Sequence, residues 1–258
     1  IFPLLLIPYL ATSAAEKLVW SDEFNGESID YSKWGVEENA YGGGNNEQQI
    51  YRWDQKNLRV EGGNLIIEAH NDKPNVVGTS RPYSSARIRT KHRGDWKYCR
   101  IDVRAKLPIG KGIWPAIWML GKDGVWPDRG EIDITEWFGR YSDQYTVTSA
   151  VHNGAFSGGD LANAPSSNPQ TAQQRLNDLC TAYHNFQLHW TASSLVIGVD
   201  NVPTLTYRKT SSSNAQWPFD QPAFLLLNVA VGGNLGGSVN PSDISKMTMY
   251  VDYVRVWQ

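Results

Sequence analysis

Short stretches of alternating apolar and polar residues recur along almost the whole chain. In "CRIDVRAKL" the residues Ile101, Val103, Ala105 and Leu107 alternate with charged residues, and a period of two is typical of a strand with one buried face. Clusters of Gly, Pro, Asn and Ser separate similar segments, which are "NLRVEGGNLIIEA", "TVTSAVH", "FQLHW", "SLVIGVD", "FLLLNVAVGG" and "YVDYVRVW". Many short strands with turn signals predict an all-β fold, a sandwich or a barrel.

One segment favours a helix. In "TAQQRLNDLC", residues 171–180, the apolar side chains of Ala172, Leu176 and Leu179 have helical spacing. The preceding polar stretch, residues 154–170, is predicted to be a long loop. Because the 258 residues contain neither an internal repeat nor a long linker, we expect a single domain over residues 16–258.

The first fifteen residues, "IFPLLLIPYLATSAA", form an apolar run that ends in small residues. The run is short for a membrane span and is typical of a signal peptide's apolar core with its cleavage site. A buried first strand is the alternative interpretation. We expect residues 1–15 to be the remnant of a signal peptide and the protein to be secreted or periplasmic.

Charge and cysteine content exclude several classes of function. A formal net charge of −2 favours neither nucleic-acid binding, which needs a basic face, nor attachment to a membrane surface. An apolar content of 41% is typical of a globular protein with a core. Two cysteines, Cys99 and Cys180, are too few for a disulfide framework, and the sequence leaves open whether they form one bridge or two separate thiols.

Three acids are concentrated in "GEIDITEWFG", residues 130–139. Strand alternation places Glu131, Asp133 and Thr135 on one face and the isoleucines on the other. Glu136 would then point to the wrong side. A β-bulge near Ile134 or Thr135 would return Glu136 to the face of the other two acids, as bulges beside active sites do.

Paired carboxylates on an open face suggest glycoside chemistry. The two glutamate backbones lie roughly 13 Å apart, and side chains that lean inward can approach the separation of about 5–5.5 Å found in retaining glycosidases. The sequence does not exclude the wider carboxyl separation of inverting glycosidases. A solvated sheet face and a calcium site are also alternative interpretations of the three acids. Aromatic rings stack well on sugar rings, although tryptophans are more often core residues, and the tryptophans near the acids are Trp114, Trp118, Trp126 and Trp137.

Together these residues resemble glycoside hydrolase family 16, and within it the laminarinase-like endo-β-1,3-glucanases. The resemblance rests on "GEIDITE", preceded by "GIWPAIWML" and "WPDR", and on further segments in the family's order, which include "LVWSDEFNG", "NNEQQIY", "SSARIRTK" and "YVDYVRVW". It implies a β-jelly roll of two curved antiparallel sheets with a substrate cleft across the concave one. It also implies retaining hydrolysis of internal β-1,3-glucosidic bonds in a β-glucan, with no cofactor needed for catalysis.

The resemblance assigns a role to individual residues. Glu131 resembles the nucleophile, Glu136 the general acid/base, and Asp133 the acid that tunes the pair. Substrate contacts are expected for Asn46, Glu47, Arg87, Trp114, Trp118, Trp126, Trp137 and His152. A structural calcium site on the convex side is expected at Glu23, Gly63 and Asp252, partly through backbone carbonyls.

Three functions from different classes follow from this resemblance. The favoured one is a monomeric endo-β-1,3-glucanase. The second is a hydrolase or transglycosylase of the same family that acts on mixed-linkage β-glucan, a galactan or xyloglucan. The third is a non-catalytic glucan-binding protein, against which the intact trio Glu131, Asp133 and Glu136 argues.

Overall fold

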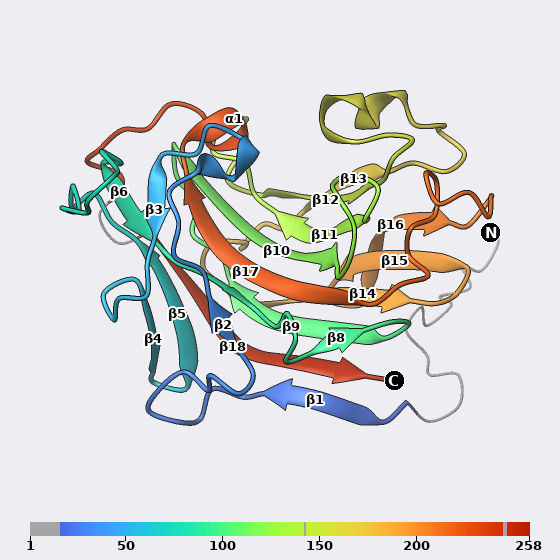
Figure 1. Cartoon of the computed structure of the whole chain (residues 1–258), viewed down its shortest axis with the longest axis horizontal. Coiled ribbons are helices and arrows are strands. Elements are labelled where there is room, and N and C mark those ends of the chain that lie inside the picture. The colour runs from blue at the N-terminus through green and yellow to red at the C-terminus, as the bar shows by residue number, and fades with distance from the viewer. Residues whose placement is uncertain (1–15, 142, 245–246) are drawn as a thin grey trace.

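The structure is a computed structural model that describes residues 16–141, 143–244 and 247–258. The predicted signal segment, residues 1–15, lies outside the described residues. Two large, curved antiparallel sheets are stacked face to face in the described part of the chain (Figure 1).

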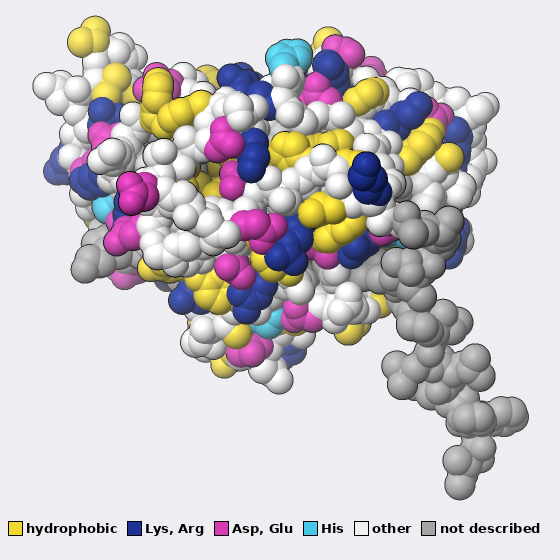
Figure 2. Space-filling view, turned by 90° about the horizontal axis from the view of Figure 1, so that it is seen from below, with side chains coloured by type: hydrophobic (Ala, Val, Ile, Leu, Met, Phe, Trp, Pro, Cys, Tyr) yellow, Lys and Arg dark blue, Asp and Glu magenta, His cyan; other side chains and the backbone are white. Residues whose placement is uncertain are grey.

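We call one layer the back sheet. Its strands, in spatial order, are β16 (Val202–Arg208), β15 (Ser194–Val199), β14 (His184–Trp190), β9 (Arg100–Lys106), β18 (Met247–Trp257), β5 (Asn64–Ala69) and β4 (Leu58–Glu61), with β1 (Leu18–Asp22) also paired to β18. The predicted alternation holds in β9, because Ile101, Val103 and Ala105 are fully buried and face the other layer. Figure 2 shows the molecule from below, where basic, acidic and apolar side chains are mixed on the surface.

The other layer, which we call the site sheet, carries the three acids. Its strands, in order, are β13 (Thr171–Arg175), β12 (Thr146–His152), β11 (Glu131–Glu136), β10 (Ile113–Gly121), β17 (Ala223–Val231), β7 (Arg87–Arg89) and β2 (Gly35–Val36), with β8 (Asp95–Trp96) beside β17. Smaller elements are the parallel pair β3 (Gln49–Tyr51) and β6 (Tyr83–Ser85), the 3-10 turns η1 (Gly42–Gly44) and η2 (Gly158–Asn163), and the short helix α1 (Gly233–Gly236). The predicted all-β fold is confirmed.

The helix predicted for residues 171–180 is wrong. Residues Thr171–Arg175 form β13, which pairs with β12 along its whole length, from Ala150↔Thr171 to Thr146↔Arg175. The chain then turns, and Leu179 is fully buried in the core. Pairing with the free edge of β12 satisfies the backbone hydrogen-bonding groups of β13. This tertiary contact stabilises a strand more than the weak helical spacing of the apolar residues favours a helix.

Both cysteines are free thiols, so the two-thiol alternative is confirmed. Cys99 is buried, and burial raises the pKa of its thiol, which therefore stays protonated. Among the described residues, no helix is long and apolar enough to cross a membrane.

Candidate active site

A β-bulge in β11 places the acids. On β10, Ile117 pairs with Thr135 and the next residue, Trp118, pairs with Asp133. Ile134 is therefore the extra residue, and it is fully buried. The bulge predicted near Ile134 or Thr135 is confirmed.

The strand register continues from the acids across the site sheet. Glu136 pairs with Ala116 on β10, Ala116 with Asn228 on β17, and Asn228 with Arg87 on β7. Directly paired residues share a face of a sheet. Because of the bulge, Glu136 therefore lies on the same face as Arg87, in a row that crosses four strands.

Burial governs the charges of the acids. Asp133 is 1% exposed, Glu136 is 8% exposed and Glu131 is half-buried, so the trio as a whole is not a solvated sheet face. Burial, and next the charge of Asp133, raise the pKa of Glu131 to about 8. Burial raises the pKa of Asp133, and burial followed by the charge of Asp133 raises the pKa of Glu136 well above its usual value. The trio therefore retains protons at pH values where exposed carboxyls are ionised.

Two tryptophans bond directly to the two glutamates. Trp126 Nε1 donates to Glu131 Oε2 at 2.7 Å, and Trp114 Nε1 donates to Glu136 Oε1 at 2.8 Å. The bond from Trp126 favours the ionised form of Glu131. Because Oε1 of Glu136 is an acceptor, a proton on this group sits on Oε2.

His152 lies beside Asp133, with His152 Nε2 at 2.9 Å from Asp133 Oδ2. The backbone N–H of Gly158 donates to His152 Nδ1 at 3.0 Å. A neutral imidazole has one donor and one acceptor nitrogen, so with Nδ1 as the acceptor its proton is on Nε2. Glu131, Asp133 and His152 offer ligand atoms within 4.8 Å of one another, but a protonated Nε2 opposes metal coordination there.

The remaining predicted contact residues lie further along the site sheet. The guanidinium of Arg87 lies over the Trp118 ring, 5.4 Å from its centre, and over the Tyr51 ring at 4.5 Å. Arg87 also lies 3.8 Å from Glu47 Oε2, which accepts from Gln49 at 2.6 Å. The exposed Asn46 donates to Asn234 Oδ1 at 3.0 Å, beside α1.

For Trp137, the prediction of a substrate contact is wrong. Trp137 is 1% exposed and belongs to the hydrophobic core, and its Nε1 donates to the Asp143 carbonyl at 3.2 Å. The bulge explains this position, because Trp137 follows Glu136 and points to the opposite side of the sheet.

Two polar residues of the site were not predicted. Asn228 Oδ1 accepts from Trp118 Nε1 at 2.8 Å, and Tyr51 lies under Arg87 and donates to Glu47 at 3.3 Å. A signal for Asn228 was its position within the otherwise apolar segment "AFLLLNVAV". Tyr51 follows Glu47 and Gln49 at a period of two residues, which places the three on one side of the chain.

The residues expected to bind calcium are brought to one place on the back sheet. β1 and β5 both pair with the edge of β18 that β9 leaves free, with Asp22↔Val254 and Leu65↔Val251. Glu23, Gly63 and Asp252 each lie one or two residues from these pairs. Both carboxylates are bonded to arginines, Glu23 to Arg255 and Asp252 to Arg104, so backbone carbonyls would have to supply most of the ligands.

Comparisons with known proteins identify the family. The model of the family described as "Glycosyl hydrolases family 16" matches residues 45–255. The chain belongs to glycosyl hydrolases family 16. It is 38% identical, over 95% of its length, to the "Glucan endo-1,3-beta-glucosidase A1" of Niallia circulans, and 38% identical, over 94% of its length, to the "Beta-glucanase" of Rhodothermus marinus. The predicted family is thus confirmed, and the chain is a glycoside hydrolase.

A solved structure of the same family has the same fold. The structure of a non-specific endo-β-1,3(4)-glucanase superposes with a TM-score of 0.87 and 37% identity, and the match covers 96% of this chain and 93% of that one. The predicted jelly roll is confirmed. The chain spans 38% of the length of the Niallia circulans enzyme and 85% of the Rhodothermus marinus enzyme.

Proposed function

We propose that this chain is an endo-β-1,3-glucanase that cleaves internal bonds of laminarin-type β-glucan with retention of configuration. The observation that carries the proposal is the bulged strand β11, which puts Glu131 and Glu136 on one face with Asp133 between them. The names of the relatives from Niallia circulans and Rhodothermus marinus support a β-glucan as the substrate.

In the first step, a Glu131 carboxylate oxygen attacks the anomeric carbon while the bond to the leaving sugar oxygen breaks. Glu136 gives its proton to that oxygen, so the sugar leaves as an alcohol. The attack requires the enzyme fraction in which Glu131 is ionised and Glu136 is protonated, and the bond from the N–H of Trp126 favours the ionised form of Glu131. A raised pKa keeps Glu136 protonated for this step.

In the second step, Glu136 accepts a proton from water, and the water oxygen attacks the anomeric carbon of the glycosyl-enzyme. The ester bond to Glu131 breaks, and both glutamates return to their starting states. Two inversions give net retention. His152 lies beside Asp133, with Nε2 at 2.9 Å from Oδ2, and with Trp118 and Arg87 it would provide polar and aromatic contacts along the substrate.

A specific observation favours mixed-linkage β-1,3-1,4-glucan as a second substrate. The solved structure that superposes with a TM-score of 0.87 is described as a non-specific endo-β-1,3(4)-glucanase. This likeness supports mixed-linkage β-glucan as a second substrate of the chain.

Several further properties belong to the same proposal. We propose export directed by the apolar run of residues 1–15, a single catalytic domain over residues 16–258 and a monomeric enzyme. Calcium at Glu23, Gly63 and Asp252 would stabilise the junction of β1 and β5 on β18 and would take no part in catalysis.

Proton NMR during laminarin cleavage tests the proposal. We expect oligosaccharides of several lengths to appear early, as internal cleavage produces, with the β-anomer of the new reducing end formed first. Initial formation of the α-anomer would contradict the retaining assignment. Parallel reactions on lichenan and agarose measure the preference for mixed linkage and for galactan.

A further inference from the structure

An exposed pair of aromatic residues lies away from the acids. The rings of Tyr31 and Trp53 are 5.1 Å apart between centres, and Trp53 Nε1 donates to the Tyr31 hydroxyl at 2.7 Å. Trp53 is 60% exposed and Tyr31 is 44% exposed. A single exposed aromatic residue is ordinary, but here two rings from separate loops are held together by a hydrogen bond that satisfies the indole N–H.

The aromatic pair lies next to the β2 edge of the site sheet, at the Arg87 end of the row of site residues. That row runs from Glu136 to Arg87, and the N–H of Glu37 then donates to the Arg87 carbonyl at 2.9 Å. The next residue, Glu38, accepts from the backbone N–H of Trp53 at 3.4 Å. From β11 to β2 there are four strand spacings, or about 19 Å. Trp53 follows Tyr51 by two residues, and Tyr51 lies under Arg87, so Trp53 lies on the side of its segment that Tyr51 shares with the site. The aromatic pair therefore lies beyond the β2 edge of the site face.

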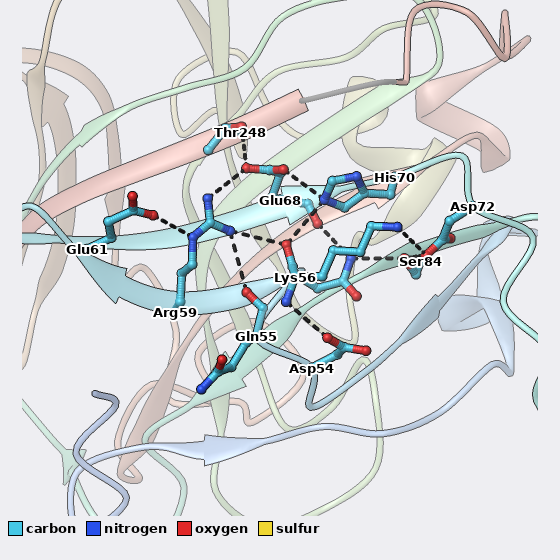
Figure 3. A network of polar contacts seen from close by, with 11 residues as sticks. Asp54, Gln55, Lys56, Arg59, Glu61, Glu68, His70, Asp72, Ser84 and Thr248 are labelled. Carbon is cyan, nitrogen blue, oxygen red and sulfur yellow. Dashed lines mark hydrogen bonds and ion pairs between the residues drawn. The ribbon is translucent and has the colours of Figure 1, made fainter. Parts of the chain in front are cut away.

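The turn that follows Trp53 is fixed by a polar network (Figure 3). Asp54 accepts from the N–H of Lys56 at 3.0 Å, and Lys56 Nζ lies 3.1 Å from Asp72. Arg59 donates to the carbonyl of Lys56 at 3.2 Å. These contacts tie the segment that carries Trp53 to β4 and to the residues that follow β5.

The loop that carries Tyr31 is fixed as well. The Tyr31 carbonyl accepts from Arg93 Nε at 2.9 Å, and the backbone N–H of Trp34 donates to the Asp30 carbonyl at 3.0 Å. Trp34 is fully buried, and its Nε1 donates to Asp22 at 2.8 Å. Both halves of the pair thus stand on ordered segments, and ligand binding would cost little ordering entropy.

We propose that Tyr31 and Trp53 form a platform that binds a distal part of the β-glucan chain whose cleaved bond lies at Glu131 and Glu136. A neutral polysaccharide presents flat C–H faces that stack on exposed rings, and its hydroxyls can bond to the neighbouring Glu38 and Arg93. The continuity with Arg87 favours the same substrate chain over an unrelated ligand. This inference rests on the proposed function and adds a site that contacts only long substrates.

The test compares kcat/KM on laminarin with kcat/KM on a short aryl β-laminaribioside, which is too short to reach from the acids to the pair. For Trp53→Ala we expect the laminarin-to-bioside ratio to fall by about three- to ten-fold, in line with the loss of one aromatic contact. Trp53→Phe keeps a flat ring and should keep most of the ratio. Tyr31→Ala gives a second, independent disruption, and Val77→Ala, at a fully exposed site on another loop, is the matched control that leaves the ratio unchanged.

Each outcome decides between the two proposals. If wild-type enzyme cleaves laminarin and both Trp53→Ala and Tyr31→Ala keep the wild-type ratio, the platform is refuted and the proposed function stands. An equal loss on both substrates also refutes the platform, because the pair would then act through the fold. If wild-type enzyme neither cleaves nor binds laminarin, both proposals fail together.

Discussion

Glu131, Asp133 and Glu136 are three carboxyls in a site where their charged forms are poorly solvated. Raised pKa values mean that folding works against ionisation of these groups. The arrangement therefore costs stability but serves the chemistry, because burial, and next the charge of Asp133, keeps Glu136 protonated as a proton donor.

Replacing Glu131 by Gln should raise the melting temperature at pH 8 and leave it nearly unchanged at pH 4. The pKa of Glu131 is about 8 in the folded protein, against an ordinary value of 4.5. Between these pH values the unfolded chain loses the proton that the folded chain keeps, so wild-type stability falls as pH rises, and the amide escapes this loss. Each kcal/mol recovered corresponds to about 2–4 °C for a chain of this size.

Calorimetry at a series of pH values measures this difference. Glu27→Gln, at an exposed position, is the control, for which no pH-dependent gain is expected. A Glu131→Gln gain of the same size at pH 4 and pH 8 would contradict the role of ionisation.

At the scale of the element, the bulge in β11 needs its own support. An extra residue disrupts the ladder, and the carbonyl of Ile134 is instead satisfied by Ser149 Oγ on β12, at 2.9 Å. Ser149 is 1% exposed. This side-chain hydrogen bond replaces a backbone hydrogen bond at the bulge, and the bulge determines the face of the sheet to which Glu136 points.

Ser149→Ala should therefore lower both stability and kcat. An unpaired buried carbonyl costs about 1–3 kcal/mol, and a slight displacement of Glu136 lowers the rate, by up to about a hundred-fold for a shift near 1 Å. Thr135→Val is the matched control, because it removes a buried hydroxyl of the same bulge that has no hydrogen-bond partner. Unchanged kcat and melting temperature in Ser149→Ala would show that the bulge does not depend on this bond.

The strands and the bulge could be predicted because their signals are local. Alternation in β9 and the isoleucines of β11 fix which side chains face the core, and one extra residue follows from the spacing of the acids. The strand β13 could not be predicted, because it depends on pairing with β12, which no local pattern reveals. Burial of Trp137 and the contact between Tyr31 and Trp53 likewise depend on how distant segments pack.

At the scale of the whole molecule, the back sheet supports the site sheet through the core between them. The junction of β1 and β5 on β18 is where the expected calcium residues meet, on the side of the core away from the acids. An ion that binds only the folded state raises stability by mass action. Calcium should thus affect the fold without affecting the chemistry.

Calcium should raise the melting temperature while kcat at low temperature stays nearly constant. Scanning calorimetry with calcium and with a chelator, alongside rate measurements, tests both parts. An unchanged melting temperature after chelation, with no metal found in the purified protein, would refute the calcium site.

The assignment of the two glutamates is the central claim, and azide rescue tests it most directly. Glu136→Ala should still form the glycosyl-enzyme from an aryl β-glucoside with an acidic phenol, because that leaving group needs no proton. Deglycosylation is then slow for lack of a base, and azide should restore turnover by attacking the anomeric carbon. We predict the β-glycosyl azide as the product of the Glu136→Ala variant. If azide instead rescues Glu131→Ala and yields the α-azide, Glu136 is the nucleophile and the two assignments must be exchanged.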